Sequence, residues 1–447
     1  MLRSNSSLSA LVDANERYDP PRCAEATRRN IVQKIEDWVR HDSHHGVSSR
    51  IFWLYGGAGA GKSALAQSLA ERFRSIGGLA ASFFFSKTDV NRNDGNRLIP
   101  TLALQLVQSF PGISPFVEKI IHSNPDLFKK NCQSQMLELF VQPLTRLWHE
   151  ETNGVQSNAA LKLRPRLVVI DGLDECTGPE TQCDLLRIIA HALPHLPYPL
   201  RFLITSRPES HITSEFQYNL GNAARYNLSD DADADKDIRR FLEEEFAKIC
   251  HTHPLRQHFP SRWPPPGSIR TIVEHSSRHF IYASTVILFI KSVHHRPDDR
   301  LQVVLGLKQP DENDRPYARL DSLYRLIFLD LQPVQREKIH HALGIMHLRS
   351  LKNGFFALPR WTSDRHAIEE LLDLRPGDLI LLFNHLRSLV TFDRGNIRIL
   401  HKTLFDYLLD PIRSEELQLD RGLAHESAAN RILMQKKFQD CWGKCSC

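Results

Sequence analysis

The sequence lacks several features that would assign a chain to a class at once. Its first residues, MLRSNSSLSALVDANERYDPP, hold no apolar core, so no secretory signal is predicted. The longest apolar run, FIYASTVILFI at residues 280–290, is shorter than the ~20 residues that a helix needs to cross a bilayer. The 8 cysteines are scattered, which is typical of free thiols in a reducing compartment. We therefore expect a cytoplasmic protein with no membrane partner.

Strong charge and internal repeats are also missing. A net charge of +5 spread over 447 residues, with no basic arm, does not favour a nucleic-acid partner. No repeat of about 20–50 residues is present, which excludes a propeller or solenoid. With 41% hydrophobic and 24% charged residues, the chain has a globular composition. Its length allows about two to four packed units at ~100–200 residues each.

Glycine is scarce as well, yet the 21 glycines include four in YGGAGAGKS at residues 55–63. This stretch fits the phosphate-binding pattern G-x-x-x-x-G-K-[ST] through Gly56, Gly61, Lys62 and Ser63. Glycines let the backbone wrap closely around phosphates, and the following helix N-terminus attracts negative charge. An accidental glycine turn is the alternative, but the strand before it and the helix after it are what a phosphate loop requires. The predicted nucleotide contacts are Gly56, Gly57, Ala58, Gly59, Ala60, Gly61, Lys62, Ser63 and Ala64.

Two of these contacts, and three acidic residues farther along the chain, have specific expected roles. Lys62 reaches the β- and γ-phosphates, and the Ser63 hydroxyl binds Mg²⁺. Asp171, at the end of the apolar run LVVI, is the second expected Mg²⁺ contact. One of the next two acidic residues, Asp174 or Glu175, orients or deprotonates the attacking water, unless this is only a solvated acidic loop.

Arg207 follows another apolar strand, FLITS, and is predicted to meet the γ-phosphate. The alternatives are a surface arginine or one that is paired with Asp174 or Glu175. We group Asp174, Glu175 and Arg207 as the candidate catalytic residues.

Strands and helices alternate along the first half of the chain. Apolar strands are predicted at residues 51–56, 79–86, 166–175 and 201–209, with helices at 27–39, after the glycine loop and after Pro100. This alternation predicts an α/β domain with a parallel sheet and helices on both faces. After Tyr226 the pattern becomes mostly helical, apart from LVTFDRGNIRIL at 389–400, where DRGN predicts a hairpin turn.

Together, WLYGGAGAGKSALA, LVVIDGLDEC and RFLITSRPE resemble the NACHT domain of STAND-class signalling P-loop NTPases, and most of all the nephrocystin-3-like NACHT regions of fungal NOD-like receptors. The resemblance extends over residues 17–440. It implies an α/β P-loop NTPase domain followed by a helical domain and a winged-helix domain. The expected divisions are a flexible segment at 1–20, the NACHT domain at 21–226, the helical domain at 227–308, the winged helix at 309–412 and a helical tail at 413–447.

The resemblance also implies one role near the end of the chain. LHKTLFDYLLD is similar to a family motif whose histidine touches the β-phosphate of ADP and locks the closed form; His401 takes that position. Leu404 replaces the motif's phenylalanine, and Arg278 and His279 stand where the family has a Gly-Leu pair. Few residues precede the NACHT region and no repeat array follows it, so a minimal or truncated member is expected.

The function implied is an ATP/ADP-binding switch with slow hydrolysis. The bound nucleotide would control self-association or association with related NACHT proteins. Its setting would be signalling or an immunity-like response such as heterokaryon incompatibility. Two alternatives stay open. One is a non-catalytic decoy or scaffold that binds nucleotide without output, and the other is a P-loop phosphotransferase.

Overall fold

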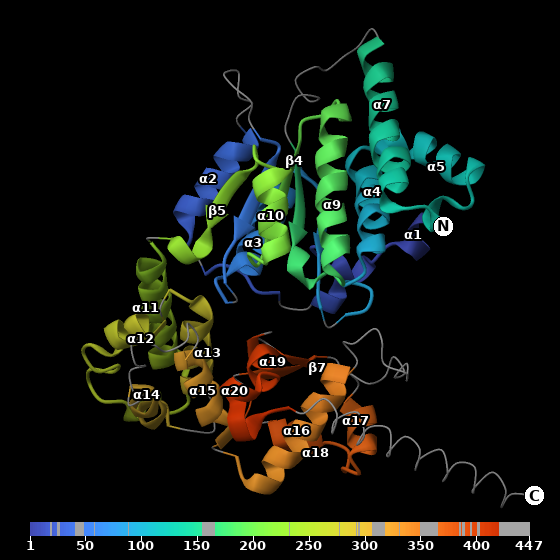
Figure 1. Cartoon of the computed structure of the whole chain (residues 1–447). Helices are drawn as coiled ribbons and strands as arrows, with labels where there is room; N and C mark the ends of the chain where they lie inside the picture. The colour runs from blue at the N-terminus through green and yellow to red at the C-terminus, as the bar shows by residue number, and fades with distance from the viewer. Residues whose placement is uncertain are drawn as a thin grey trace, which may run out of the picture. The chain divides into compact units, whose positions relative to one another are not determined.

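A computed structural model describes the chain except for residues 18–19, 25–26, 41–48, 58, 88, 154–165, 232, 277, 292, 294–295, 306–317, 330, 349–364, 384–385, 387–388, 394–395, 400–402 and 420–447. The chain forms two compact units, Met1–Ala232 and Asp233–Cys447 (Figure 1). Among the described helices, none combines the length and the apolarity that crossing a bilayer requires.

The first unit is built around a five-stranded parallel sheet with the order β2-β3-β4-β1-β5. Its strands are β1 (Ile51–Tyr55), β2 (Leu79–Phe84), β3 (Arg166–Asp171), β4 (Leu200–Ser206) and β5 (Ala224–Asn227). The four strands predicted from apolar runs are confirmed. The polar strand β5 was not predicted; it lies at the edge of the sheet and pairs only with β1 within the described residues.

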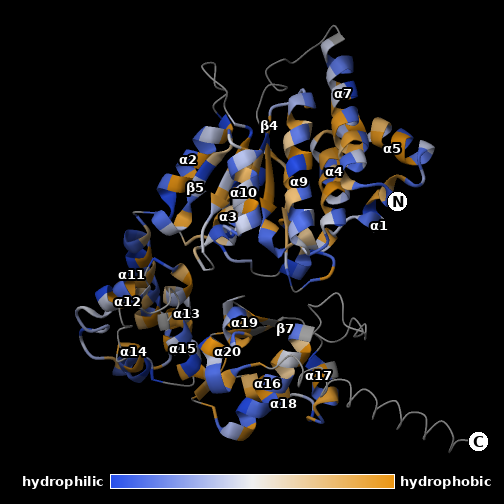
Figure 2. Ribbon diagram, in the orientation of Figure 1, coloured by the Kyte–Doolittle hydropathy of each residue, from blue (hydrophilic) through white to orange (hydrophobic). Residues whose placement is uncertain are grey.

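Both faces of the sheet are buried under helices. Alternate residues of β1 lie in different hydrophobic cores. Ile51 and Trp53 belong to one core, and Phe52 and Leu54 belong to the other. Helices α2 (Arg29–Arg40) and α3 (Lys62–Ser75) cover the Phe52 face, and α4 (Leu98–Ser109), α9 (Pro179–Ala192) and α10 (Ser210–Tyr218) cover the Trp53 face. Figure 2 shows β4 as mainly hydrophobic, as a strand buried on both faces must be. This confirms the predicted α/β class.

One helix begins earlier than expected. The sequence predicts a helix after Pro100, but α4 starts at Leu98. Proline is tolerated in the first turn because the N–H group it lacks has no intrahelical acceptor there. The remaining helical segments on this side are α5 (Ser114–Ser123), α6 (Cys132–Met136), a π-helical turn at Leu137–Val141 and α7 (Gln142–Asn153).

The N-terminal residues differ from the flexible segment expected at 1–20. Residues 1–17 form α1 (Leu2–Asn5) and two 3₁₀ turns, Leu8–Ala10 and Asn15–Arg17. The Val12 N–H donates to Ser82 Oγ of the edge strand β2 over 3.1 Å, and the Arg17 guanidinium lies 3.5 Å from the centre of the Phe84 ring. Ala10 joins one core and Val12 the other. The segment thus covers the edge of β2 and is ordered by that contact.

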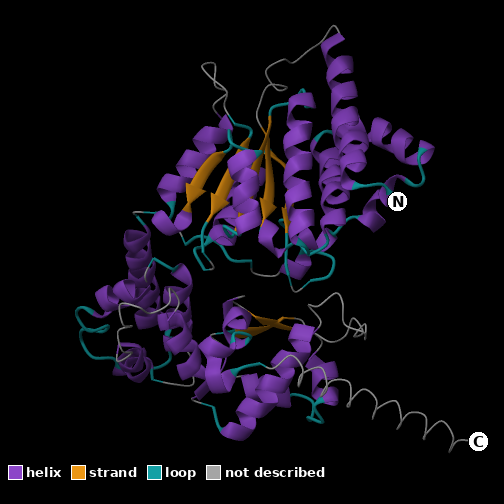
Figure 3. Ribbon diagram, in the orientation of Figure 1, coloured by secondary structure: helices purple, strands orange, loops and turns teal. Residues whose placement is uncertain are grey.

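The second unit is mostly helical and has one hydrophobic core. Its helices are α11 (Ala234–Thr252), α12 (Ser268–Ser276), α13 (Phe280–Ile290), α14 (Pro297–Leu305), α15 (Ala318–Leu329), α16 (Pro333–Leu348), α17 (Arg365–Leu371), α18 (Asp378–Phe383), α19 (Thr403–Leu408) and α20 (Pro411–Ser414). The apolar run at 280–290 is the buried helix α13. Strands β6 (Val390–Asp393) and β7 (Asn396–Ile399) form the antiparallel hairpin that DRGN predicts (Figure 3). Most of the tail predicted at 413–447 lies outside the described residues.

Candidate functional site

The glycine loop joins the end of β1 to the start of α3. Gly59 and Gly61 have φ angles of 73° and 94°, in the left-handed region that favours glycine. The Leu65 N–H donates to Gly61 O over 3.0 Å, so the N–H groups of Lys62, Ser63 and Ala64 precede the first helical hydrogen bond. A helix start of this kind has N–H groups ready for an anion. Of the predicted loop contacts, Ala58 alone lies outside the described residues.

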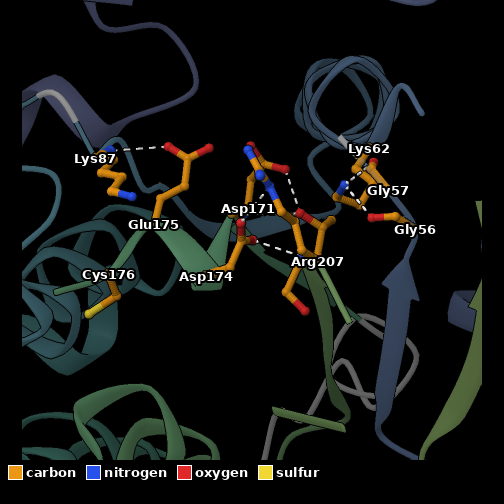
Figure 4. Close-up of polar contacts among 12 residues, drawn as sticks. Gly56, Gly57, Lys62, Lys87, Asp171, Asp174, Glu175, Cys176 and Arg207 are labelled. Carbon is orange, nitrogen blue, oxygen red and sulfur yellow. Dashed lines mark hydrogen bonds and ion pairs between the residues drawn. The ribbon is translucent and has the colours of Figure 1, made fainter. Parts of the chain in front are cut away.

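The Lys62 side chain is held within the loop. Its Nζ donates to Gly56 O and to Gly57 O, each over 2.8 Å (Figure 4). Burial lowers the pKa of Lys62 from 10.5 to about 8, and the positive charge of Arg207 adds to the shift, while the charge of Asp174 opposes it. A phosphate can replace these two carbonyl contacts, because the carbonyls and a phosphate would bind the same ammonium group.

Asp171 ends β3 at the carboxyl edge of the sheet and is 4% exposed. The Thr205 hydroxyl of the neighbouring strand donates to Asp171 Oδ1 over 2.6 Å and accepts the Gly172 N–H over 3.0 Å. Thr205 therefore fixes the orientation of this carboxylate. Sequence analysis missed Thr205; the signal was a polar residue near the end of an otherwise apolar strand.

Asp174 and Arg207 are brought together. Asp174 lies in the 3₁₀ turn Leu173–Glu175, and its Oδ1 accepts the Arg207 N–H over 3.0 Å. The Arg207 Nε lies 3.4 Å from Asp174 Oδ2. Burial raises the pKa of Asp174, with a further contribution from the charge of Glu175, although the Arg207 N–H opposes the shift. Of the three interpretations of Arg207, the pairing with Asp174 is the one that this structure contains.

Glu175 is positioned differently from Asp174. Its Oε2 accepts the backbone N–H of Lys87, which follows β2, over 3.1 Å. Cys176 is 3% exposed, and in Figure 4 its sulfur points away from the charged side chains. Both candidate water-activating carboxylates therefore accept a main-chain N–H, and Asp174 is in addition paired with the Arg207 side chain.

Ser63 and Asp171 offer a hydroxyl and a carboxylate, the oxygen donors that Mg²⁺ prefers. The buried Asp171 carboxylate keeps a second oxygen beside the one that Thr205 orients, so the donor set fits Mg²⁺. The described residues contain no cluster of three or more His, Cys, Asp or Glu side chains that could hold another metal.

His401 lies outside the described residues, so the predicted ADP lock stays a prediction. Residues Thr403–Leu408 of its motif form α19, in which Leu404 is fully buried in the core of the second unit. The Tyr324 hydroxyl of α15 lies 2.7 Å from Thr403 Oγ1, so the residue two positions after His401 is anchored.

One comparison with known proteins gives a family match, and the matched residues include the site. Residues 27–207 match the family described as Nephrocystin 3, N-terminal. This segment is nephrocystin-3-like. The nephrocystin-3-like segment contains the glycine loop, both acidic positions after β3 and Arg207, its last residue. The predicted resemblance to nephrocystin-3-like proteins is thereby confirmed over these residues.

No curated protein matches the chain. Among solved structures, the Aeropyrum pernix Orc1 protein in complex with DNA is similar with a TM-score of 0.35 and 14% identity, over 87% of this chain and 90% of that one. Cdc6p from Pyrobaculum aerophilum is similar with a TM-score of 0.36 and 12% identity, over 91% of this chain and 98% of that one.

Proposed function

We propose that the protein is an ATP/ADP-binding switch of the STAND class that hydrolyses ATP slowly. The observation that carries this proposal is the arrangement at the carboxyl edge of the sheet: the half-buried Lys62 of the glycine loop together with the charges of Asp171, Asp174, Glu175 and Arg207. A triphosphate needs a cation, helix N–H groups and a metal contact, and this edge has a candidate for each. Adenine is the base implied by the family resemblance.

Within this proposal, Ser63 and Asp171 would hold Mg²⁺, which would neutralise charge on the phosphates. Glu175 is the better candidate for orienting or deprotonating the attacking water, because the Lys87 N–H holds its carboxylate whether or not Arg207 stays paired with Asp174. A base on a fixed backbone contact keeps its geometry without rearrangement.

Arg207 distinguishes ATP from ADP in this mechanism. In the nucleotide-free protein its guanidinium pairs with Asp174. A γ-phosphate carries more negative charge than one carboxylate, so ATP would draw Arg207 away from Asp174 whereas ADP would leave the pair in place. Breaking or keeping this pair is how the site would report which nucleotide is bound.

The second unit supplies the output of the proposed switch. His401 would bind the β-phosphate of ADP and keep a closed form, and exchange for ATP would permit self-association or association with related NACHT proteins. The hairpin β6–β7, which lies between α18 and α19 in the chain, supports the assignment of a winged helix. The expected setting is signalling of the heterokaryon-incompatibility kind.

Light scattering after size-exclusion chromatography, in ADP and in ATP, measures particle size and tests this function. A phosphate-release assay measures hydrolysis alongside it. The proposal expects monomers with ADP, larger assemblies with ATP, and ATP-trapped assemblies of Glu175→Gln. A Glu175→Gln protein that binds ATP and behaves like wild type would favour the scaffold. Transfer of phosphate to an added small acceptor would favour a phosphotransferase. Identical particle size in both nucleotides would refute the switch.

A further inference from the structure

The segment Leu228–Asp231, which follows β5, contacts the glycine loop from outside the phosphate site. Ser229 Oγ accepts the Gly57 N–H over 3.1 Å. Leu228 is fully buried and shares a core with Ala60. A Cβ added at Gly56 would lie 3.2 Å from Ser229 Oγ and 3.3 Å from Leu228 Cβ, so the loop and the segment are closely packed.

Arg28 adds a second hold on the same loop. This residue precedes α2 with a φ of 57°, and its side chain is 3% exposed. Its Nη1 forms an ion pair with Asp231, which is 7% exposed, and its Nη2 donates to Ala60 O over 3.1 Å. A buried arginine in left-handed backbone needs strong compensation, and the carboxylate and the carbonyl supply it.

These contacts fix both ends of one turn. The Ala60 N–H donates to Gly57 O over 3.4 Å, which closes the turn from Gly57 to Ala60. Ser229 holds the Gly57 N–H at one end, and Arg28 holds the Ala60 carbonyl at the other. The Gly57 N–H and the Ala60 carbonyl make these outer contacts. They are different groups from the N–H groups at the start of α3.

We propose that Arg28, Ser229 and Asp231 are positioning residues that hold the glycine loop in its phosphate-binding shape and so set nucleotide affinity. A preformed loop loses less conformational freedom on binding, and that difference appears as tighter binding. Asp231 lies two residues before Asp233, where the second unit begins, so the same contacts join the loop to the chain that enters that unit. This inference rests on the proposed nucleotide site.

The first test is the double variant Arg28→Met/Asp231→Leu, which replaces the ion pair by apolar side chains and avoids leaving one charge buried alone. Its Kd for ATP and ADP should rise roughly tenfold, equivalent to ~1.4 kcal/mol, because the Ala60 carbonyl loses its donor. The maximal rate of hydrolysis should stay near that of wild type, because neither residue touches phosphate. The matched control Arg187→Met/Glu215→Leu removes the ion pair between α9 and α10 and should leave Kd unchanged.

The second test covers the case in which the double variant does not fold. Ser229→Ala removes one hydroxyl, and its Kd should rise several-fold, while Ser229→Thr, which keeps the acceptor, should restore affinity. Folded variants that bind nucleotide as tightly as wild type would overturn the inference and leave the nucleotide site intact. A wild-type protein that binds no nucleotide would instead refute the proposed function itself.

Discussion

The pKa of Lys62 makes nucleotide affinity depend on pH in a defined direction. Burial lowers this pKa from 10.5 to about 8, so the side chain of the nucleotide-free protein loses its proton within an accessible range. Phosphate binding needs the ammonium form. Affinity should therefore be nearly constant below about pH 7 and fall as the pH rises through this pKa, because the protein must then take up a proton to bind.

The size of the effect follows from the fraction of Lys62 that is protonated. With a pKa of about 8, that fraction is about 0.9 at pH 7, about 0.5 at pH 8 and about 0.1 at pH 9. The association constant should thus fall about tenfold between pH 7 and pH 9, or about 1.4 kcal/mol. The phosphates of the nucleotide hardly contribute, since a phosphate group with a second pKa of ≈ 6 is already ionised there.

Isothermal titration calorimetry with ADP from pH 7 to pH 9.5 measures this dependence and, in buffers of different ionisation enthalpy, the proton uptake. Uptake should approach one proton per nucleotide at the high end. Lys62→Arg is the control, because an arginine stays charged throughout and its affinity, whatever its value, should not change. A wild-type affinity that is constant from pH 7 to pH 9, without proton uptake, would refute the reasoning.

Three further predictions concern single side chains. Thr205→Val removes the hydroxyl that orients Asp171, so about tenfold more Mg²⁺ should be needed for half-maximal ATPase activity; an unchanged requirement would exclude Asp171 as the metal contact. His401→Ala should weaken ADP more than ATP and increase spontaneous assembly, and an equal loss of both affinities would exclude the lock. Leu203→Ala, at a fully buried position of β4, should lower the free energy of unfolding by ~2–5 kcal/mol in urea titrations, and a loss below ~1 kcal/mol would contradict the buried core.

Local patterns predicted much of the first unit. Apolar runs located β1 to β4, and the carboxylates after β3 and the arginine after β4 indicated the edge of the sheet at which Asp171, Asp174 and Arg207 lie. The edge strand β5 escaped because its residues, ARYN, are neither apolar nor alternating. The structure of the N-terminal segment was not predicted, because short 3₁₀ turns give little periodicity in the sequence. The segment is held by its contact with β2, and a local sequence pattern does not show such a contact.

The outer contacts of the glycine loop could not be predicted for a different reason. Arg28 and Asp231 are 203 residues apart, and each is an ordinary charged residue in its own neighbourhood. Their pairing follows from the order of the sheet, which places β5 beside β1 and so brings the segment after β5 to the loop after β1. Thr205 is similar: its role depends on the pairing of β3 with β4.

The most direct test of the central claim is the nucleotide content of the purified protein. Denatured protein, analysed by ion-pair chromatography, should release about one ADP per chain, and Lys62→Ala protein should release none, because it lacks the ammonium group that we propose reaches the β- and γ-phosphates. An empty wild-type protein that also fails to bind added ADP or ATP with Mg²⁺ would contradict the account.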